Sequence, residues 1–367
     1  MEFIKNGAEL IQKMIDNAVS DGSNTCTVTG NYEIEQTILL PSDFVLYLDN
    51  CHLRMKDNTF CNMFNNVHCR TPEGRTIDGT DRNITIIGRG RAILDGGEYN
   101  GLCERNSQKD GRPHISVNNV ILFSNVDGFR IEHIHVRNQR WWALNFIHCR
   151  NGYLGYIDFL ADYTTIDENG VRHEGLGMRH YDGSTATYEQ VYVKNADGID
   201  LRTGCHDIII ENITGFTEDD TIALTGLYGY SEKTFDVEGL DDDIYNVSIR
   251  NIQSSAYCAI VRLLNQGGVK LYNILIDGVF DTSKGSKYME RGGSGVRVGD
   301  VHMYGSRHAT ADETFNITVK NVYSRAGAAL RLAGAMSNCV FENIRTFDDA
   351  PIVIDNNASV DIRPFLK

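Results

Sequence analysis

Two short acidic segments are the residues best suited to carry out chemistry. They span residues 195–200 and 218–224 and lie about one structural repeat apart. Together they supply five carboxylates: Asp197, Asp200, Glu218, Asp219 and Asp220. If a repetitive fold stacks the two segments, like charges come together and raise the pKa of at least one carboxyl group. A proton donor then lies beside an ionised base.

This pairing suits cleavage of a glycosidic bond, which needs a protonated acid at the leaving oxygen and an ionised group near the anomeric carbon. Asp219 is our candidate acid, while Asp200 and Glu218 could tune the pKa of their neighbours. Two alternatives stay open. The acids could form a solvated turn, because Asp is frequent in turns, or they could bind calcium.

Three arginines recur at nearly the same point of successive predicted strands: Arg262, Arg297 and Arg331. They could form one wall beyond the acids, where their guanidinium groups would bind the carboxylate of an acidic sugar. The alternative is ion pairing with Asp300 or with other surface acids.

Aromatic and histidine side chains are weaker candidates for substrate binding. Trp142 and Tyr257 could stack on a sugar face, although large aromatics more often pack in the interior. Residues 163–187 interrupt the repeat before the first acidic segment and predict a loop over the site, or else a disordered insertion. His180 in this loop is a further candidate, although a lone histidine is usually structural.

Repeated short strands organise the chain around these residues. A turn residue, an alternating apolar strand and a second turn recur from anchors at Asn246, Asn273, Asn316 and Asn338. Asn246 and Asn273 are 27 residues apart and Asn316 and Asn338 are 22 apart, which gives a repeat of about 22 to 27 residues; larger gaps indicate extra coils or loop insertions. A second ladder of short strands runs out of phase with the first and includes residues 198–201, 221–224, 260–263 and 295–298.

Two strands of period two in each repeat exclude helical solenoids. They predict an all-β chain that forms a single-stranded right-handed parallel β-helix, whose coils bury their inward side chains against neighbouring coils. We expect one domain over residues 1–367, closed by an amphipathic capping helix within residues 1–20. A β-sandwich is the alternative, but it gives no reason for a ladder of this period.

The composition of the chain limits the classes of ligand that it can bind. The net charge of −14 disfavours nucleic acid and anionic membranes as general ligands, and no apolar run is long enough to span a bilayer. The nine scattered cysteines show neither a disulfide framework nor metal-ligand spacing, so we expect reduced thiols, no metal and no cofactor. The N-terminus lacks the apolar core of a secretory signal, which predicts a cytoplasmic protein.

Residues 195–198, Asn-Ala-Asp-Gly, and the Asp219-Asp220 pair resemble the acidic motifs of glycoside hydrolase family 28, the polygalacturonase-like β-helix enzymes. The upstream segments 30–32, 88–90 and 95–97 are also similar, so the resemblance spans most of residues 1–345. It implies that Asp197 and Asp220 hold and activate a water for single displacement with inversion. Two motifs depart from the family. Residues 256–259, Ala-Tyr-Cys-Ala, stand where it has Gly-His-Gly, and residues 297–299, Arg-Val-Gly, stand where it has Arg-Ile-Lys.

These features lead us to expect a glycosidase whose binding partner is its substrate, a plant-type or uronic-acid-containing oligosaccharide or polysaccharide. The departures from the family suggest that the substrate-recognising edge has been rebuilt for another sugar. A polysaccharide lyase or epimerase on the same scaffold and a non-catalytic carbohydrate-binding β-helix are the alternatives.

Overall fold

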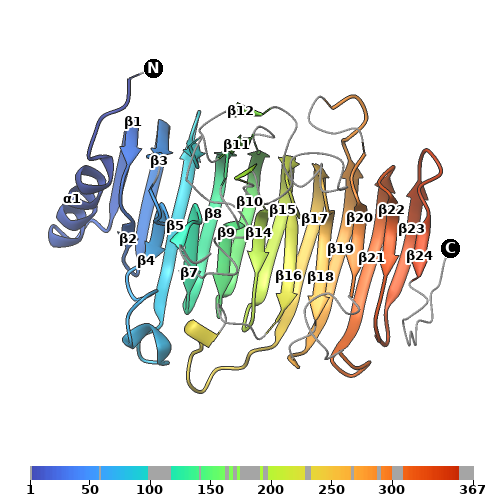
Figure 1. The fold of residues 1–367 in the computed structure, drawn as a ribbon. Coiled ribbons are helices and arrows are strands. Elements are labelled where there is room, and N and C mark those ends of the chain that lie inside the picture. Colours follow the sequence, from blue (N-terminus) through green and yellow to red (C-terminus); the bar gives the residue numbers. More distant parts are fainter. Residues whose placement is uncertain are drawn as a thin grey trace.

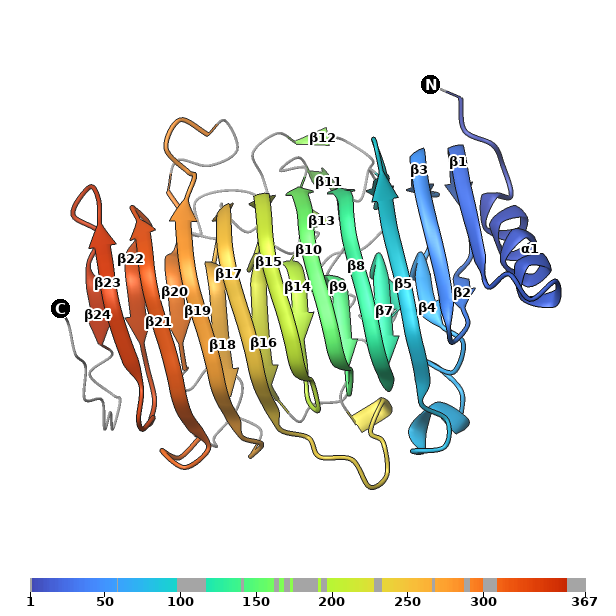
Figure 2. The ribbon, with the colours of Figure 1, turned by 180° about the vertical axis from the view of Figure 1, so that it is seen from behind.

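The chain forms a parallel β-helix closed at one end by a helix (Figure 1). The computed structural model describes residues 2–57, 59–97, 117–139, 142–161, 165–167, 172–173, 191–192, 197–227, 233–265, 268–286, 291–299 and 309–354. Each coil gives one strand to each of two large sheets, and the coils follow one another in chain order (Figure 2). The predicted fold class is confirmed.

The first sheet contains the longer strands, and its neighbours pair in parallel. In spatial order these are β1 (Thr25–Ile34), β3 (Phe44–Met55), β5 (Asp81–Arg89), β8 (Val126–Arg137), β10 (Arg150–Leu160), β15 (His206–Thr217), β17 (Ile244–Ala256), β19 (Leu271–Asp281), β21 (Thr314–Ser324) and β23 (Val340–Thr346), with β6 (Ile93–Asp95) between β3 and β8.

The second sheet contains the short strands of the other predicted ladder, also in parallel. In spatial order they are β2 (Ile38–Leu40), β4 (Phe64–Asn66), β7 (Ile121–Ser124), β9 (Trp142–Ile147), β14 (Asp197–Leu201), β16 (Ile222–Gly226), β18 (Ala259–Asn265), β20 (Ser294–Val298), β22 (Ala328–Leu332) and β24 (Ile352–Ile354). A short 3-10 helix, η1 (Glu73–Arg75), follows β4.

The core is a continuous apolar column between the two sheets. Alternation in each strand turns every second side chain inward, and parallel pairing puts inward positions of successive coils in line. Ile210, Ile249 and Ile276 occupy one such column and are fully buried. Burial of an isoleucine of this kind contributes roughly 1.5–3 kcal/mol, so stability accumulates coil by coil.

Left-handed asparagines turn the chain into the strands of the first sheet, as the anchor pattern predicts. Asn246, Asn273 and Asn316 each have φ of 54°. Asparagine tolerates this conformation because its short side chain can bond locally. The Asn273 amide donates to Asn246 Oδ1 at 3.1 Å, and the Asn316 amide donates to Asn273 Oδ1 at 3.2 Å. The amides therefore form a ladder that locks the register of successive coils.

The helix α1 (Gly7–Ser20) covers the open end of the first coil. Ile11 and Ile15 on its apolar face are buried in the core. Gln12 pairs with the edge of β2, since its amide accepts from Leu39 N at 2.7 Å and donates to Leu39 O at 3.2 Å. The helix thus closes an edge on which another strand could otherwise pair.

Residues 163–187 were predicted to form a loop insertion. The described parts of this region include β11 (Thr165–Asp167) and β12 (Arg172–His173), which form a small antiparallel sheet with β13 (Val191–Tyr192). Most of the segment, including His180, lies outside the described residues. Eight cysteines in the described part of the chain are free thiols, and no helix there is long and apolar enough to cross a membrane.

Candidate active site

The two acidic segments lie on neighbouring coils at the start of two paired strands. Asp197 opens β14, while Glu218, Asp219 and Asp220 form the corner between β15 and β16. The parallel pairing of β14 with β16 extends into this corner, because Ile199 N donates to Thr221 O at 2.9 Å. The corner therefore lies directly beside Asp197.

A direct hydrogen bond joins the two coils at the acids. The backbone N–H of Asp220 donates to Asp197 Oδ1 at 3.1 Å, and Gly198 N donates to the Asp220 carbonyl at 2.9 Å. An added Cβ at Gly198 would overlap the Thr221 carbonyl oxygen, so glycine permits this close approach. These contacts fix the position of the Asp197 carboxylate against the Asp219–Asp220 turn.

Buried hydroxyl groups form a chain of hydrogen bonds next to the acidic turn. Thr217 Oγ1 and Thr221 Oγ1 are 3.0 Å apart, and Thr221 Oγ1 is 2.8 Å from Ser254 Oγ on the next coil. Ser254 Oγ donates in turn to the Gly215 carbonyl at 3.0 Å. The chain of hydroxyls satisfies polar groups inside the corner and ties the acidic turn to the next coil through Ser254.

Burial and mutual repulsion shift the acids toward their protonated forms. Burial, and then the nearby charges of Asp219, Asp200 and Asp220, raise the pKa of Asp197 well above its usual value. Burial raises the pKa of Asp220 to about 7; Asp219 adds to this, and Arg262 opposes it. At least one carboxyl group of the cluster therefore retains a proton near neutral pH, which provides a general acid.

Asp219 differs from its neighbours in exposure and in contacts. It is half-buried, whereas Asp197 and Asp220 are buried. The Cys258 thiol donates a hydrogen bond to the Asp219 carboxylate. Burial raises the pKa of Asp219, while this thiol and the charges of Arg262 and Arg297 oppose the rise. Asp219 is thus the acid most open to a ligand, and its proton affinity is set by contacts from two further coils.

The three predicted arginines lie at equivalent positions of neighbouring strands, as expected. Arg262, Arg297 and Arg331 are register partners on β18, β20 and β22. Arg262 is buried, with Nη1 3.3 Å from Asp220 Oδ2, so it pairs with an acid of the site. Arg297 and Arg331 are half-buried. A line of positive charge therefore runs from the acids toward the C-terminal coils at about 4.8 Å per strand.

The two aromatic candidates have protein partners. The Arg202 guanidinium lies 3.8 Å from the centre of the Trp142 ring, so one face of this ring is already covered. Trp142 is nevertheless the register partner of Asp197 and is half-buried. Tyr257 packs against the small apolar cluster of Ala161 and Phe216. Trp142 thus lies beside the acids. The contacts of Tyr257 favour the alternative that this side chain packs in the interior.

Two residues that contact the acids, Arg202 and Cys258, were not predicted as site residues, whereas Asp200 was expected to tune its neighbours. Asp200 is 1% exposed and has Arg202 Nη1 3.8 Å from Oδ1, so this buried pair backs the acidic cluster. Cys258 lies in the tetrapeptide 256–259, which departs from the family motif. This departure was the only feature of the sequence that pointed to Cys258 as a residue of the site. No spacing in the sequence shows that the Cys258 thiol reaches Asp219.

A cation at this turn is disfavoured by its surroundings. Asp219, Asp220 and Cys258 offer ligand atoms within 4.8 Å of one another. The positive charges of Arg262 and Arg297 act on the same carboxylates. A thiol also suits soft metals rather than calcium. The arrangement is better suited to proton transfer than to binding calcium.

Comparison with solved structures shows the fold. The chain is similar to the exopolygalacturonase of Thermotoga maritima, with a TM-score of 0.54 and 13% identity over 95% of this chain and 87% of that one. It is also similar to a tailspike protein of E. coli bacteriophage HK620 (TM-score 0.55, 12% identity, 97% of this chain and 64% of that one). The A-module of the mannuronan C-5 epimerase AlgE6 from Azotobacter vinelandii gives a TM-score of 0.50 at 12% identity, covering 98% of this chain and 75% of that one.

No family model matches the chain, and no curated protein matches it either. The comparisons therefore show the fold alone, which the chain shares with an exopolygalacturonase, a mannuronan C-5 epimerase module and a tailspike protein.

Proposed function

We propose that the protein is a glycoside hydrolase that acts on a uronic-acid-containing oligosaccharide or polysaccharide. The observation that carries the proposal is the hydrogen-bonded contact of Asp197 with the Asp219–Asp220 turn, in a cluster that holds a proton near neutral pH. Hydrolysis needs such a proton for the leaving oxygen and an ionised carboxylate to activate water.

Asp219 is the proposed general acid, because it is the half-buried member of the three. In the reactive state the proton shared by the cluster would lie on Asp219, with Asp197 and Asp220 ionised to orient the water. Asp219 and Asp220 have ligand atoms within 4.8 Å of each other, less than the about 6.5–9.5 Å that separates acid and base in most inverting enzymes. Inversion, which the family resemblance implies, therefore requires Asp197 on the neighbouring coil to hold the water.

The arginine line suggests the substrate class. A polymer laid along the second sheet from β14 toward β22 would present its sugars to the acids first and then to Arg297 and Arg331. Guanidinium groups bind carboxylates through two parallel hydrogen bonds, so a sugar acid is favoured over a neutral sugar. Arg331→Ala should therefore raise KM for an acidic oligosaccharide by roughly tenfold and change kcat little.

A lyase or epimerase is the second candidate, because Arg262 and Arg297 lie beside the acids and a cation there would stabilise charge developing on a uronate. The products separate the two. Elimination gives an unsaturated sugar that absorbs in the ultraviolet, epimerisation leaves the chain length unchanged, and hydrolysis gives a new reducing end.

The test is a library of uronic-acid oligosaccharides incubated with the wild type and with Asp219→Asn. We expect new reducing ends with the wild type, a loss of at least about 10²-fold in kcat for the variant, and an inverted anomer by NMR. A matched control is Asp312→Asn, which alters an exposed acid. Binding without any product across the library would leave a carbohydrate-binding protein instead.

A further inference from the structure

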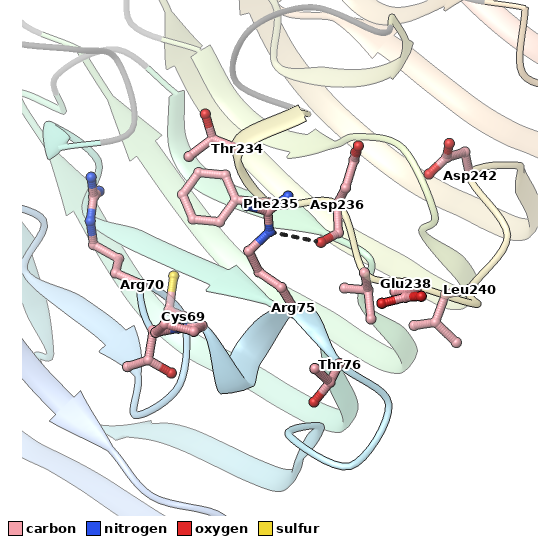
Figure 3. Close-up of a pocket in the computed structure, with 13 residues that line it drawn as sticks. Cys69, Arg70, Arg75, Thr76, Thr234, Phe235, Asp236, Glu238, Leu240 and Asp242 are labelled. Atoms are coloured by element: carbon pink, nitrogen blue, oxygen red, sulfur yellow. Dashed lines mark hydrogen bonds between the residues drawn. The ribbon is translucent and has the colours of Figure 1, made fainter.

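A cavity of about 820 Å³ lies at the opposite ends of the second-sheet strands from the acidic site. One wall is the segment after β4 with Arg75 and Thr76, and the other is the segment after β16 with Phe235, Asp236 and Asp242 (Figure 3). None of the residues lining it belongs to the candidate active site. The cavity is therefore a separate feature.

A buried histidine lies beside the two loop acids. His148 follows β9 and is 1% exposed, and neither of its ring nitrogens has a hydrogen-bond partner among the described residues. A buried polar group without a partner is costly, so such a nitrogen needs a reason in the structure.

The imidazole ring is oriented toward the acids. An added Cβ at Gly204 would overlap His148 Nδ1, so the backbone of that turn packs against this edge of the ring. Nε2 lies 3.2 Å from Asp242 Oδ1. His148, Asp236 and Asp242 each offer one ligand atom, and these three atoms lie within 4.8 Å of one another.

The separation of Nε2 and Oδ1 suits two ligands of one metal ion. Bonds of about 2.0–2.2 Å from zinc to nitrogen and oxygen place neighbouring ligands about 2.8–3.6 Å apart in octahedral or tetrahedral arrangements. The observed 3.2 Å falls in this interval, while the pair lacks the direction of a hydrogen bond.

Other contacts hold the acids in place. Gly204 N donates to the Asp242 carbonyl at 2.8 Å, and Arg75 Nε donates to the Asp236 carbonyl at 3.3 Å (Figure 3). The backbone of both acids is thus fixed by contacts that do not involve their carboxylates. A ligand set fixed in this way loses little entropy when it binds an ion.

We propose that His148, Asp236 and Asp242 form a binding site for a divalent transition-metal ion, with Zn²⁺ as the reference ion. One imidazole and two carboxylates suit zinc-like ions better than Mg²⁺ or Ca²⁺, which prefer oxygen ligands alone. Three protein ligands would leave a coordination position open for a further ligand, and two of the three, Asp236 and Asp242, line the cavity. The ion would join the coil at β9 to the loop between β16 and β17.

Isothermal titration of the full chain, stripped with a chelator and dialysed, tests this with ZnCl₂ and MgCl₂. We expect one Zn²⁺ per chain with a Kd of about 10 μM or tighter, and weakening by at least about tenfold in Asp242→Asn and in Asp236→Asn. Both acids are half-buried, so these variants should fold, which circular dichroism checks. Glu238→Gln, a neutralisation in the same loop, should bind as the wild type does.

Cys258→Ser removes the thiol of the other cluster that could take zinc, and it should leave this binding unchanged. The proposal is wrong if Zn²⁺ does not bind, if Asp242→Asn binds as tightly as the wild type, if Cys258→Ser abolishes binding, or if Mg²⁺ binds equally well.

Discussion

Replacing Asp220 by asparagine removes a carboxyl group whose pKa burial raises from 3.8 to about 7. In the folded protein this group keeps its proton over about three pH units in which the unfolded chain has lost it. The wild type therefore has the full contribution of this group below about pH 4 and loses it as the pH rises to about 7. At about 1.4 kcal/mol per unit, the loss is about 4 kcal/mol.

Asparagine does not titrate, so the stability of the variant does not decrease with pH through this position. It also lacks the contact between Asp220 Oδ2 and Arg262, which adds an offset to the free energy of unfolding at every pH. The useful quantity is therefore how the difference between variant and wild type changes with pH. We expect the free energy of unfolding of the variant, relative to that of the wild type, to rise by about 4 kcal/mol between about pH 4 and about pH 8.

Urea unfolding followed by circular dichroism over this pH range measures the difference, with Asp312→Asn as the control for removal of an exposed acid. A flat difference, or one that falls with pH, would refute the idea that burial and repulsion keep a proton in the cluster.

Three further changes test the contacts around the site and the coils. Cys258→Ala should raise the pKa of Asp219 and move the alkaline limb of the pH–activity profile upward, whereas Cys258→Ser keeps a donor and should leave it in place. Gly215→Ala should lower the free energy of unfolding by roughly 2–4 kcal/mol, because φ is 115° and the new Cβ would overlap a carbonyl of β10; Gly22→Ala, with open space around it, should cost about 1 kcal/mol. Asn273→Ala should cost about 2 kcal/mol in urea unfolding, and Asn273→Gly less, because glycine adopts φ of 54° without strain. An equal effect of the two members of any pair would contradict the role given to that thiol, glycine or asparagine.

The coil architecture was predictable because it follows from spacing alone. Alternation with period two defines the strands, and the recurring turn residues mark equivalent positions of neighbouring strands even where loops change the length of the repeat. The shared register of Arg262, Arg297 and Arg331 follows from this rule. The neighbouring positions of the two acidic segments follow from it as well.

Side-chain contacts at the corners could not be predicted from the repeat, because rotamers and turn geometry are not periodic. The stacking of Arg202 on Trp142 and the thiol contact between Cys258 and Asp219 are of this kind. The approach of His148 to Asp242 joins segments far apart in the sequence and depends on an irregular loop. No motif spacing encodes it.

The most direct test of the central claim is hydrolysis of a uronic-acid oligosaccharide in H₂¹⁸O, followed by mass spectrometry of the products. If Asp197, Asp219 and Asp220 form one hydrolytic centre, the wild type will place one ¹⁸O at each new reducing end and Asp219→Asn will form almost no labelled product. Unlabelled, unsaturated fragments from the wild type, or equal labelling with Asp219→Asn, would contradict it.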